Sequence, residues 1–117
     1  MTAIDPAVAD PIAVALRLIE RCAVLARCSS LEEGICRTYL SPEHQACNTL
    51  VGEWMTEAGL TVRTDAAGSL IGHRPGATPD APILLIGSHL DSIPDAGAYD
   101  GILGVLLGIE VCAALST

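Results

Sequence analysis

Phenylalanine and lysine are both absent from this 117-residue sequence, and aromatic residues make up only 3% of it. The positive charge comes from six dispersed arginines, which face fourteen acidic residues and leave a net charge of −8. Proteins that bind a nucleic-acid backbone need clustered cations, so this composition predicts no nucleic-acid partner. Half of the residues are hydrophobic, so the chain can bury a core, and its length fits one domain at most.

Long apolar runs are also missing. The stretch 12–26 is interrupted by Arg17 and the stretch 101–115 by Glu110, so neither reaches the ~20 apolar residues of a membrane span. The first residues carry Asp5 where a secretory signal would carry Lys or Arg. We therefore expect no membrane partner and a cytoplasmic protein.

The five cysteines form no CxxC pair, which argues against a zinc knuckle or a redox motif. Three of them, Cys22, Cys47 and Cys112, fall on the apolar sides of helical patterns. In a reducing compartment such residues are small members of the core, so we predict buried, inert thiols.

Proline and glycine divide the chain into elements. Asp10-Pro11 predicts the start of a helix that runs to about Arg27, and residues 29–40 then form a loop. The predicted buried stripe of this helix is Ile12, Leu16, Ile19, Ala23 and Ala26. Ser41-Pro42 predicts a second helix, which Gly59 terminates. Its predicted stripe is Cys47, Leu50 or Val51, Trp54 and Ala58.

The middle of the chain reads as strands. Residues 60–64 alternate like a strand, residues 65–68 form a turn, and residues 69–73 return as a hairpin partner. After a surface loop at 74–82, the run 83–86 (Ile-Leu-Leu-Ile) is apolar without alternation. This pattern predicts a strand that is covered on both faces.

A polar loop follows this run, and a third helix begins near residues 99–101, so the fold class is α/β. In an open α/β sheet the ligand site lies beyond the carboxyl ends of the strands, where His89 and Asp100 fall. Imidazole nitrogen and carboxylate oxygen suit zinc or manganese. Asp91 is close enough in sequence to hold the second ring nitrogen of His89.

Three ordinary roles stand beside this hypothesis. His89 is equally a loop histidine with satisfied hydrogen bonds, Asp91 an Asx-turn residue, and Asp100 the N-cap of the third helix. Two ligands also do not close a tetrahedral site. Two other histidines, His44 and His73, are expected at the surface.

The segment Gly87-Ser88-His89-Leu90-Asp91-Ser92-Ile93-Pro94, followed by residues 97–101 and 103–106, resembles the first metal-binding segment of a known enzyme family. This is the allantoate amidohydrolase and N-carbamoyl-L-amino-acid hydrolase family, within the aminoacylase and glutamate-carboxypeptidase-like metallohydrolases. The similarity continues upstream in residues 37–44, 54–55, 58–60 and 65–68, and it covers most of the chain from about residue 12.

The resemblance implies part of a three-layer α/β/α catalytic domain with two divalent metal ions, zinc or manganese, with cobalt as a further candidate. His89 would bind one ion, Asp100 would bridge both, and Asp91 would be the catalytic acid oriented on His89. The implied reaction is hydrolysis of a carbon–nitrogen bond in a linear ureido compound. Allantoate is the first expected substrate, N-carbamoyl amino acids are the second, and the substrates of a related peptidase or deacylase are the third. A homodimer is implied for the full-length enzyme.

The sequence departs from the family in two ways. Ser69 and Ala96 stand where the family usually has Asn and often Gly, outside the implied ligand set. The downstream glutamates and histidines of the family also have no counterpart, since Glu32-Glu33 precedes His89 and is expected to be a solvated pair. Residues 1–117 would thus form the N-terminal part of one catalytic domain, inactive alone, with the dimerisation domain absent.

Such a piece would leave apolar residues without partners, so association of the isolated chain is expected. The residues expected to lack partners are Ile102, Val105, Leu106, Ile109 and Val111. Gly101, Gly104 and Gly108 share one helical face and are expected to allow close packing of the third helix against the sheet. The competing hypothesis is a non-catalytic product that acts only through association at an exposed sheet edge.

Overall fold

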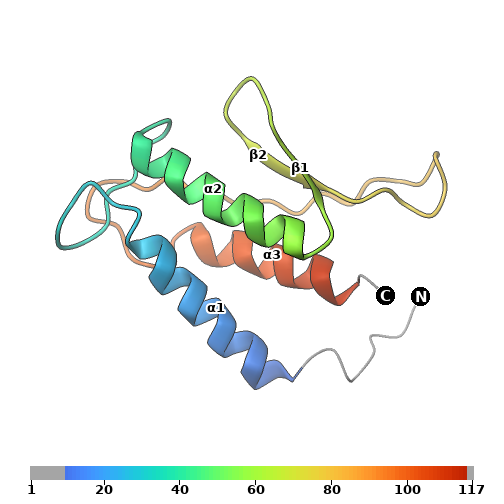
Figure 1. Cartoon of the computed structure of the whole chain (residues 1–117), viewed down its shortest axis with the longest axis horizontal. Coiled ribbons are helices and arrows are strands. Elements are labelled where there is room, and N and C mark those ends of the chain that lie inside the picture. Colours follow the sequence, from blue (N-terminus) through green and yellow to red (C-terminus); the bar gives the residue numbers. More distant parts are fainter. Residues whose placement is uncertain (1–9, 116–117) are drawn as a thin grey trace.

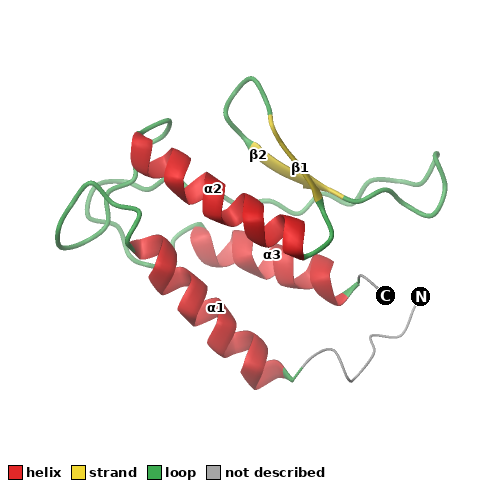
Figure 2. Ribbon diagram, in the orientation of Figure 1, coloured by secondary structure: helices red, strands yellow, loops and turns green. Residues whose placement is uncertain are grey.

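The computed structural model describes residues 10–115 and combines helices with one small sheet (Figures 1 and 2). The elements are α1 (Pro11–Ala26), α2 (Pro42–Glu57), β1 (Thr61–Thr64), β2 (Leu70–His73) and α3 (Ile102–Ala114). Helix α1 packs against α3, and α2 packs against both strands. The mixed composition agrees with the predicted α/β class. The first residues, whose Asp5 favoured a cytoplasmic protein, lie outside the described residues.

Both predicted helix starts are confirmed by their caps. The Asp10 carboxylate accepts a hydrogen bond from the Ile12 N–H at 3.0 Å, and the Ser41 hydroxyl accepts one from the His44 N–H at 3.1 Å. A proline follows each cap, where its missing N–H has no helical partner to lose. Gly59 follows α2 with a φ of 85°, a conformation that favours glycine at a helix end.

The predicted hairpin is confirmed. Strands β1 and β2 are antiparallel, with Thr61 opposite His73 and Thr64 opposite Leu70. The Asp65 carboxylate accepts from the N–H groups of Ala67 and Ser69, both at 2.9 Å, and so holds the turn.

The core lies between the three helices. Its buried members are Leu18, Cys22, Leu25, Cys47, Val51, Ala58, Leu90, Ile102, Leu106 and Ile109. The predicted burial of Cys22 and Cys47 is confirmed, while Cys112 is half-buried. Burial raises the pKa of the Cys47 thiol to about 11, so this thiol stays protonated and unreactive at neutral pH.

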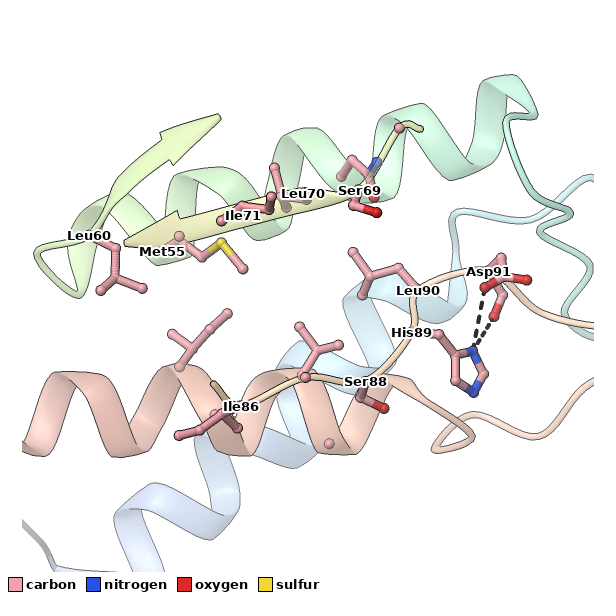
Figure 3. A pocket seen from close by; sticks show the side chains of 18 of the residues that line it. Met55, Leu60, Ser69, Leu70, Ile71, Ile86, Ser88, His89, Leu90 and Asp91 are labelled. Carbon is pink, nitrogen blue, oxygen red and sulfur yellow. Dashed lines mark hydrogen bonds and ion pairs between the residues drawn. The ribbon is translucent and has the colours of Figure 1, made fainter. Parts of the chain in front are cut away.

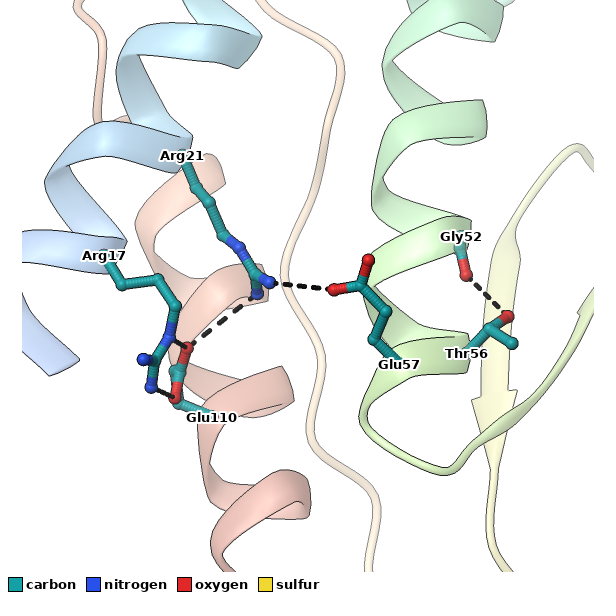
Figure 4. A network of polar contacts seen from close by, with 6 residues as sticks. All are labelled: Arg17, Arg21, Gly52, Thr56, Glu57 and Glu110. Carbon is teal, nitrogen blue, oxygen red and sulfur yellow. Dashed lines mark hydrogen bonds and ion pairs between the residues drawn. The ribbon is translucent and has the colours of Figure 1, made fainter. Parts of the chain in front are cut away.

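The predicted buried face of α1 is wrong. Ile12, Leu16 and Ile19 are exposed, and the helix instead buries Leu18, Cys22 and Leu25. Apolar residues occur on both sides of this helix, so spacing alone does not select the face. The buried face is the one whose Leu18, Cys22 and Leu25 pack in the core shared with α2 and α3, and a network of ion pairs joins other residues of α1 to these two helices (Figure 4).

That network joins α1 to the other two helices. Both carboxylate oxygens of Glu110 accept from Arg17, at 2.7 and 2.8 Å, and Arg21 reaches Glu57 at 3.3 Å. The hydrogen bond from Arg17 lowers the pKa of the Glu110 carboxyl. The charges that interrupt the apolar stretches of the sequence are therefore paired between helices. None of the helices in residues 10–115 has the length and apolar character to cross a membrane.

The predicted covered strand at 83–86 is also wrong. These residues belong to no strand, and Leu84 and Leu85 are 82% and 87% exposed. A strand needs a neighbouring backbone, and the sheet of the described residues contains only β1 and β2. The segment instead runs beside α3, where a Cβ on Gly108 would lie 3.1 Å from Ile86, and one on Gly104 would lie 2.8 Å from Ser88. The expected close packing at these glycines is confirmed, but its partner is this irregular segment and not the sheet.

The expected lack of partners in α3 is partly wrong. Ile102, Leu106 and Ile109 are buried, because they pack against the core residues of α1 and α2. Leu103, Leu107 and Val111 form the opposite face of α3 and are exposed. The predicted solvation of Glu32-Glu33 is confirmed, since both residues are exposed.

We expect the isolated chain to self-associate through residues 83–86. Exposed apolar side chains beside an unpaired backbone favour pairing with a second chain. Sedimentation at increasing concentration should show oligomers, and Leu84→Lys with Leu85→Lys should shift them to monomers. A monomer that unfolds cooperatively at all concentrations would contradict this expectation.

His44, expected at the surface, is instead buried, and its Nδ1 accepts from the Leu40 N–H at 3.0 Å. Burial, which disfavours the charged ring, lowers its pKa. As the pH falls through about 6.5, the unfolded chain therefore binds a proton at His44 that the folded chain does not. The free energy of unfolding should accordingly be highest above this pH and should fall below it. Urea unfolding at pH 7.5 and pH 5 should show this loss, and His44→Gln should reduce it. An unchanged pH dependence in His44→Gln would assign the loss to other groups.

Candidate active site

The predicted site residues lie where the segment 83–93 meets the start of α3. His89 and Asp91 belong to the loop after the apolar run, and Asp100 directly precedes the Gly101 N-cap of α3. A Cβ on Gly101 would lie 2.5 Å from the His89 ring and from its carbonyl oxygen. Glycine at this position, with a φ of 73°, therefore allows the helix start and the His89 loop to touch.

The structure brings all three predicted residues together. The His89 Nδ1 lies 2.9 Å from the Asp91 carbonyl oxygen and 3.5 Å from its carboxylate (Figure 3). On the other side of the ring, Nε2 lies 3.7 Å from the Asp100 carboxylate. All three side chains are partly exposed, so a ligand can reach them from solvent.

These distances assign the tautomer of His89. A carbonyl oxygen only accepts hydrogen bonds, so Nδ1 carries the proton and donates it to Asp91. In the neutral ring, Nε2 then keeps its lone pair on the side of Asp100. Metal-binding histidines have this arrangement, with one nitrogen held by a carbonyl or carboxylate and the other free to coordinate.

The pair fits part of a metal site. Two ligands that each lie about 2.0–2.1 Å from one zinc ion at the tetrahedral angle are about 3.4 Å apart, close to the 3.7 Å between Nε2 and the Asp100 oxygen. Within residues 10–115, no group of three or more His, Cys, Asp or Glu side chains could hold a metal ion. His89 and Asp100 therefore offer two ligands of an ion that needs more.

The alternative prediction that Asp100 is the N-cap of the third helix is wrong. The N-cap of α3 is Gly101, and no side chain makes a cap hydrogen bond there. The Asp100 carboxylate, 62% exposed, faces His89 instead.

A cavity of about 470 Å³ adjoins the site. His89 and Asp91 line one end, and Met55, Leu60 and Ile71 line the apolar other end (Figure 3). Asn48 also lines it, and the buried side-chain oxygen of this residue has no hydrogen-bond partner in the described part of the chain. Sequence reasoning missed Asn48, because its position on α2 gives no sign of the cavity.

Comparison with known proteins gives close relatives. The N-carbamoyl-L-amino-acid amidohydrolase of Pseudomonas sp. (strain NS671) is 49% identical over 85 residues, which are 73% of this chain and 20% of that enzyme. Allantoate deiminase 2 of Glycine max is 42% identical over 79 residues, 68% of this chain and 16% of that protein. No family model matches the chain.

A solved structure shows the same arrangement of elements. The crystal structure of a hydantoinase/carbamoylase family amidase from Burkholderia ambifaria matches with a TM-score of 0.79 at 40% identity, over 86% of this chain and 25% of that one. The chain is thus homologous to a segment of an amidohydrolase. It belongs to the hydantoinase/carbamoylase family of amidases, which confirms the predicted resemblance. It spans about a fifth of the length of the curated relatives it matches.

Proposed function

We propose that this chain supplies part of the active site of a metal-dependent amidohydrolase that cleaves linear ureido compounds. The observation that carries the proposal is the His89 ring, whose Nδ1 is held by Asp91 while Nε2 faces Asp100 at 3.7 Å. His89 and Asp100 would hold the metal, with Asp100 as the bridge between two ions. The remaining ligands would come from outside these 117 residues.

The residues of this chain have distinct roles in the proposal. Asp91 orients the His89 ring through its carbonyl, and its carboxylate, 3.5 Å from the ring, is placed to hold a proton beside the site. A bound zinc or manganese ion would supply Lewis-acid polarisation of the substrate carbonyl and would lower the pKa of water. The unpartnered Asn48 oxygen is an acceptor for a ureido N–H group in the adjoining cavity.

Two substrates represent the ureido class. Sequence reasoning placed allantoate first, and the relatives include an allantoate deiminase at 42% identity. Two N-carbamoyl-L-amino-acid amidohydrolases are 49% and 47% identical and a third is 37% identical, so both substrates enter the test on equal terms.

A chimera tests the proposal. The matched 85-residue segment of the Pseudomonas enzyme is replaced by that of this chain, and hydrolysis of an N-carbamoyl-L-amino acid and of allantoate is measured with zinc or manganese. We expect activity on at least one substrate, and its loss in Asp100→Ala. A folded chimera whose activity survives Asp100→Ala would contradict the proposal. The isolated chain should show no turnover, because two ligands do not complete the site.

A further inference from the structure

Arg37 is a buried cation that the proposed chemistry does not use. Its side chain is 2% exposed, and no carboxylate in residues 10–115 forms an ion pair with it. A buried charge is costly unless hydrogen bonds compensate it, so its partners indicate what it does.

Those partners belong to two segments. The guanidinium Nη1 donates to the carbonyls of Leu25 and Cys28, at 2.9 and 2.8 Å, where α1 ends. The negative end of the helix dipole there stabilises a cation. On its other side, Nε donates to the Leu90 carbonyl at 2.7 Å. Arg37 therefore connects the end of α1 to the loop that carries the candidate site.

The main chain of Arg37 binds the same loop. Its N–H donates to the Ser92 hydroxyl at 2.9 Å, and its carbonyl accepts from the Ser92 N–H at 2.7 Å. Residue 37 thus holds Leu90 and Ser92, the two neighbours of Asp91, through three hydrogen bonds. The Asp91 carbonyl between them is the group that accepts from His89 Nδ1.

We propose that Arg37 is a positioning residue for the active site: it fixes the backbone around Asp91 so that the Asp91 carbonyl holds the His89 ring with Nε2 toward Asp100. The metal-binding consequence rests on the proposed function, whereas the orientation of the ring does not. Loss of contacts that orient a metal-binding histidine typically weakens metal affinity 10–100-fold.

The test measures the ring itself. In the 117-residue chain labelled with ¹⁵N-histidine, long-range ¹H–¹⁵N spectra at pH 8 report the tautomer of each ring, and variants of His44 and His73 assign the signals. We expect the Nδ1–H tautomer for His89 and its loss in Arg37→Met, with partial recovery in Arg37→Lys. Arg17→Met is the matched control, because it breaks the ion pair with Glu110 and should leave the His89 signal unchanged.

Circular dichroism checks that each variant is folded. A folded Arg37→Met chain that keeps the Nδ1–H tautomer would overturn the proposal. If Arg37→Met does not fold, Ser92→Ala decides, because it frees the same backbone by removing the bond from the Arg37 N–H to the hydroxyl, together with the bond from the hydroxyl to the Ile93 carbonyl: a changed signal supports the proposal, and an unchanged one overturns it. The chimera separates the two proposals, because the 117-residue chain holds only two of the metal ligands. If the activity of the folded chimera survives Asp100→Ala, the proposed function fails, while the tautomer result still decides the role of Arg37.

Discussion

Alanine at position 89 or 100 should weaken divalent-metal binding by the chimera that supplies the remaining ligands. His89 Nε2 and the Asp100 carboxylate are the two groups that face each other at 3.7 Å, and neither has a substitute nearby in the described residues. Loss of a ligand should cost more than the 10–100-fold that follows loss of an orienting contact, so we expect zinc affinity to fall by more than about 100-fold. Calorimetric titration of the chimera and its variants with zinc and with manganese measures this.

The chain offers matched controls for both substitutions. His73 ends β2 and Asp80 lies in the loop after it, and both side chains are exposed. His73→Ala and Asp80→Ala should therefore keep the wild-type affinity. Equal affinities in His89→Ala and the wild type would show that any bound metal sits elsewhere.

Replacing Gly101 with alanine should disrupt the site without removing any of its polar groups. The new Cβ would lie 2.5 Å from His89 Cε1, Nδ1 and the backbone oxygen, far inside van der Waals contact. The φ of 73° adds strain for any residue with a Cβ. We expect the ring to move away from Asp91, zinc affinity to fall at least about 10-fold, and the free energy of unfolding to fall by about 1–3 kcal/mol.

Gly97→Ala is the control for this prediction, because a Cβ at this glycine of the same loop would meet no atom within 4 Å. Urea unfolding of both variants of the chain and zinc titration of both variants of the chimera give the comparison. A Gly101→Ala chimera with wild-type zinc affinity would show that the contact between His89 and the start of α3 does not fix the ring.

Local chemistry made the helix starts and the hairpin predictable. A cap such as Asp10 or Ser41 satisfies N–H groups two or three residues away, and Asp65 closes its turn within four residues, so sequence neighbours contain the whole interaction. The site segment was recognisable for a related reason. His89, Asp91 and Asp100 occur together with glycines that allow α3 to approach, and the structure brings them within hydrogen-bonding or ion-pair distance.

The wrong predictions concern which face of a helix is buried and which segments pair as strands. Periodicity placed Ile12 and Leu16 of α1 in the core, but Leu18 and Cys22 are buried instead, because this is the face that packs with the core residues of α3. The apolar run 83–86 has the composition of a covered strand, yet pairing requires a second backbone that residues 10–115 do not provide there.

The sequence by itself determined the helix starts, the hairpin, the family and the identity of the candidate ligands, since each depends on residues close together in the chain. Only the tertiary structure decided that His44 is buried, that Nδ1 of His89 donates to the Asp91 carbonyl, and that Arg37 connects this loop to the end of α1. Arg37 and Leu90 are 53 positions apart, and such a contact depends on how the whole chain packs rather than on any local pattern.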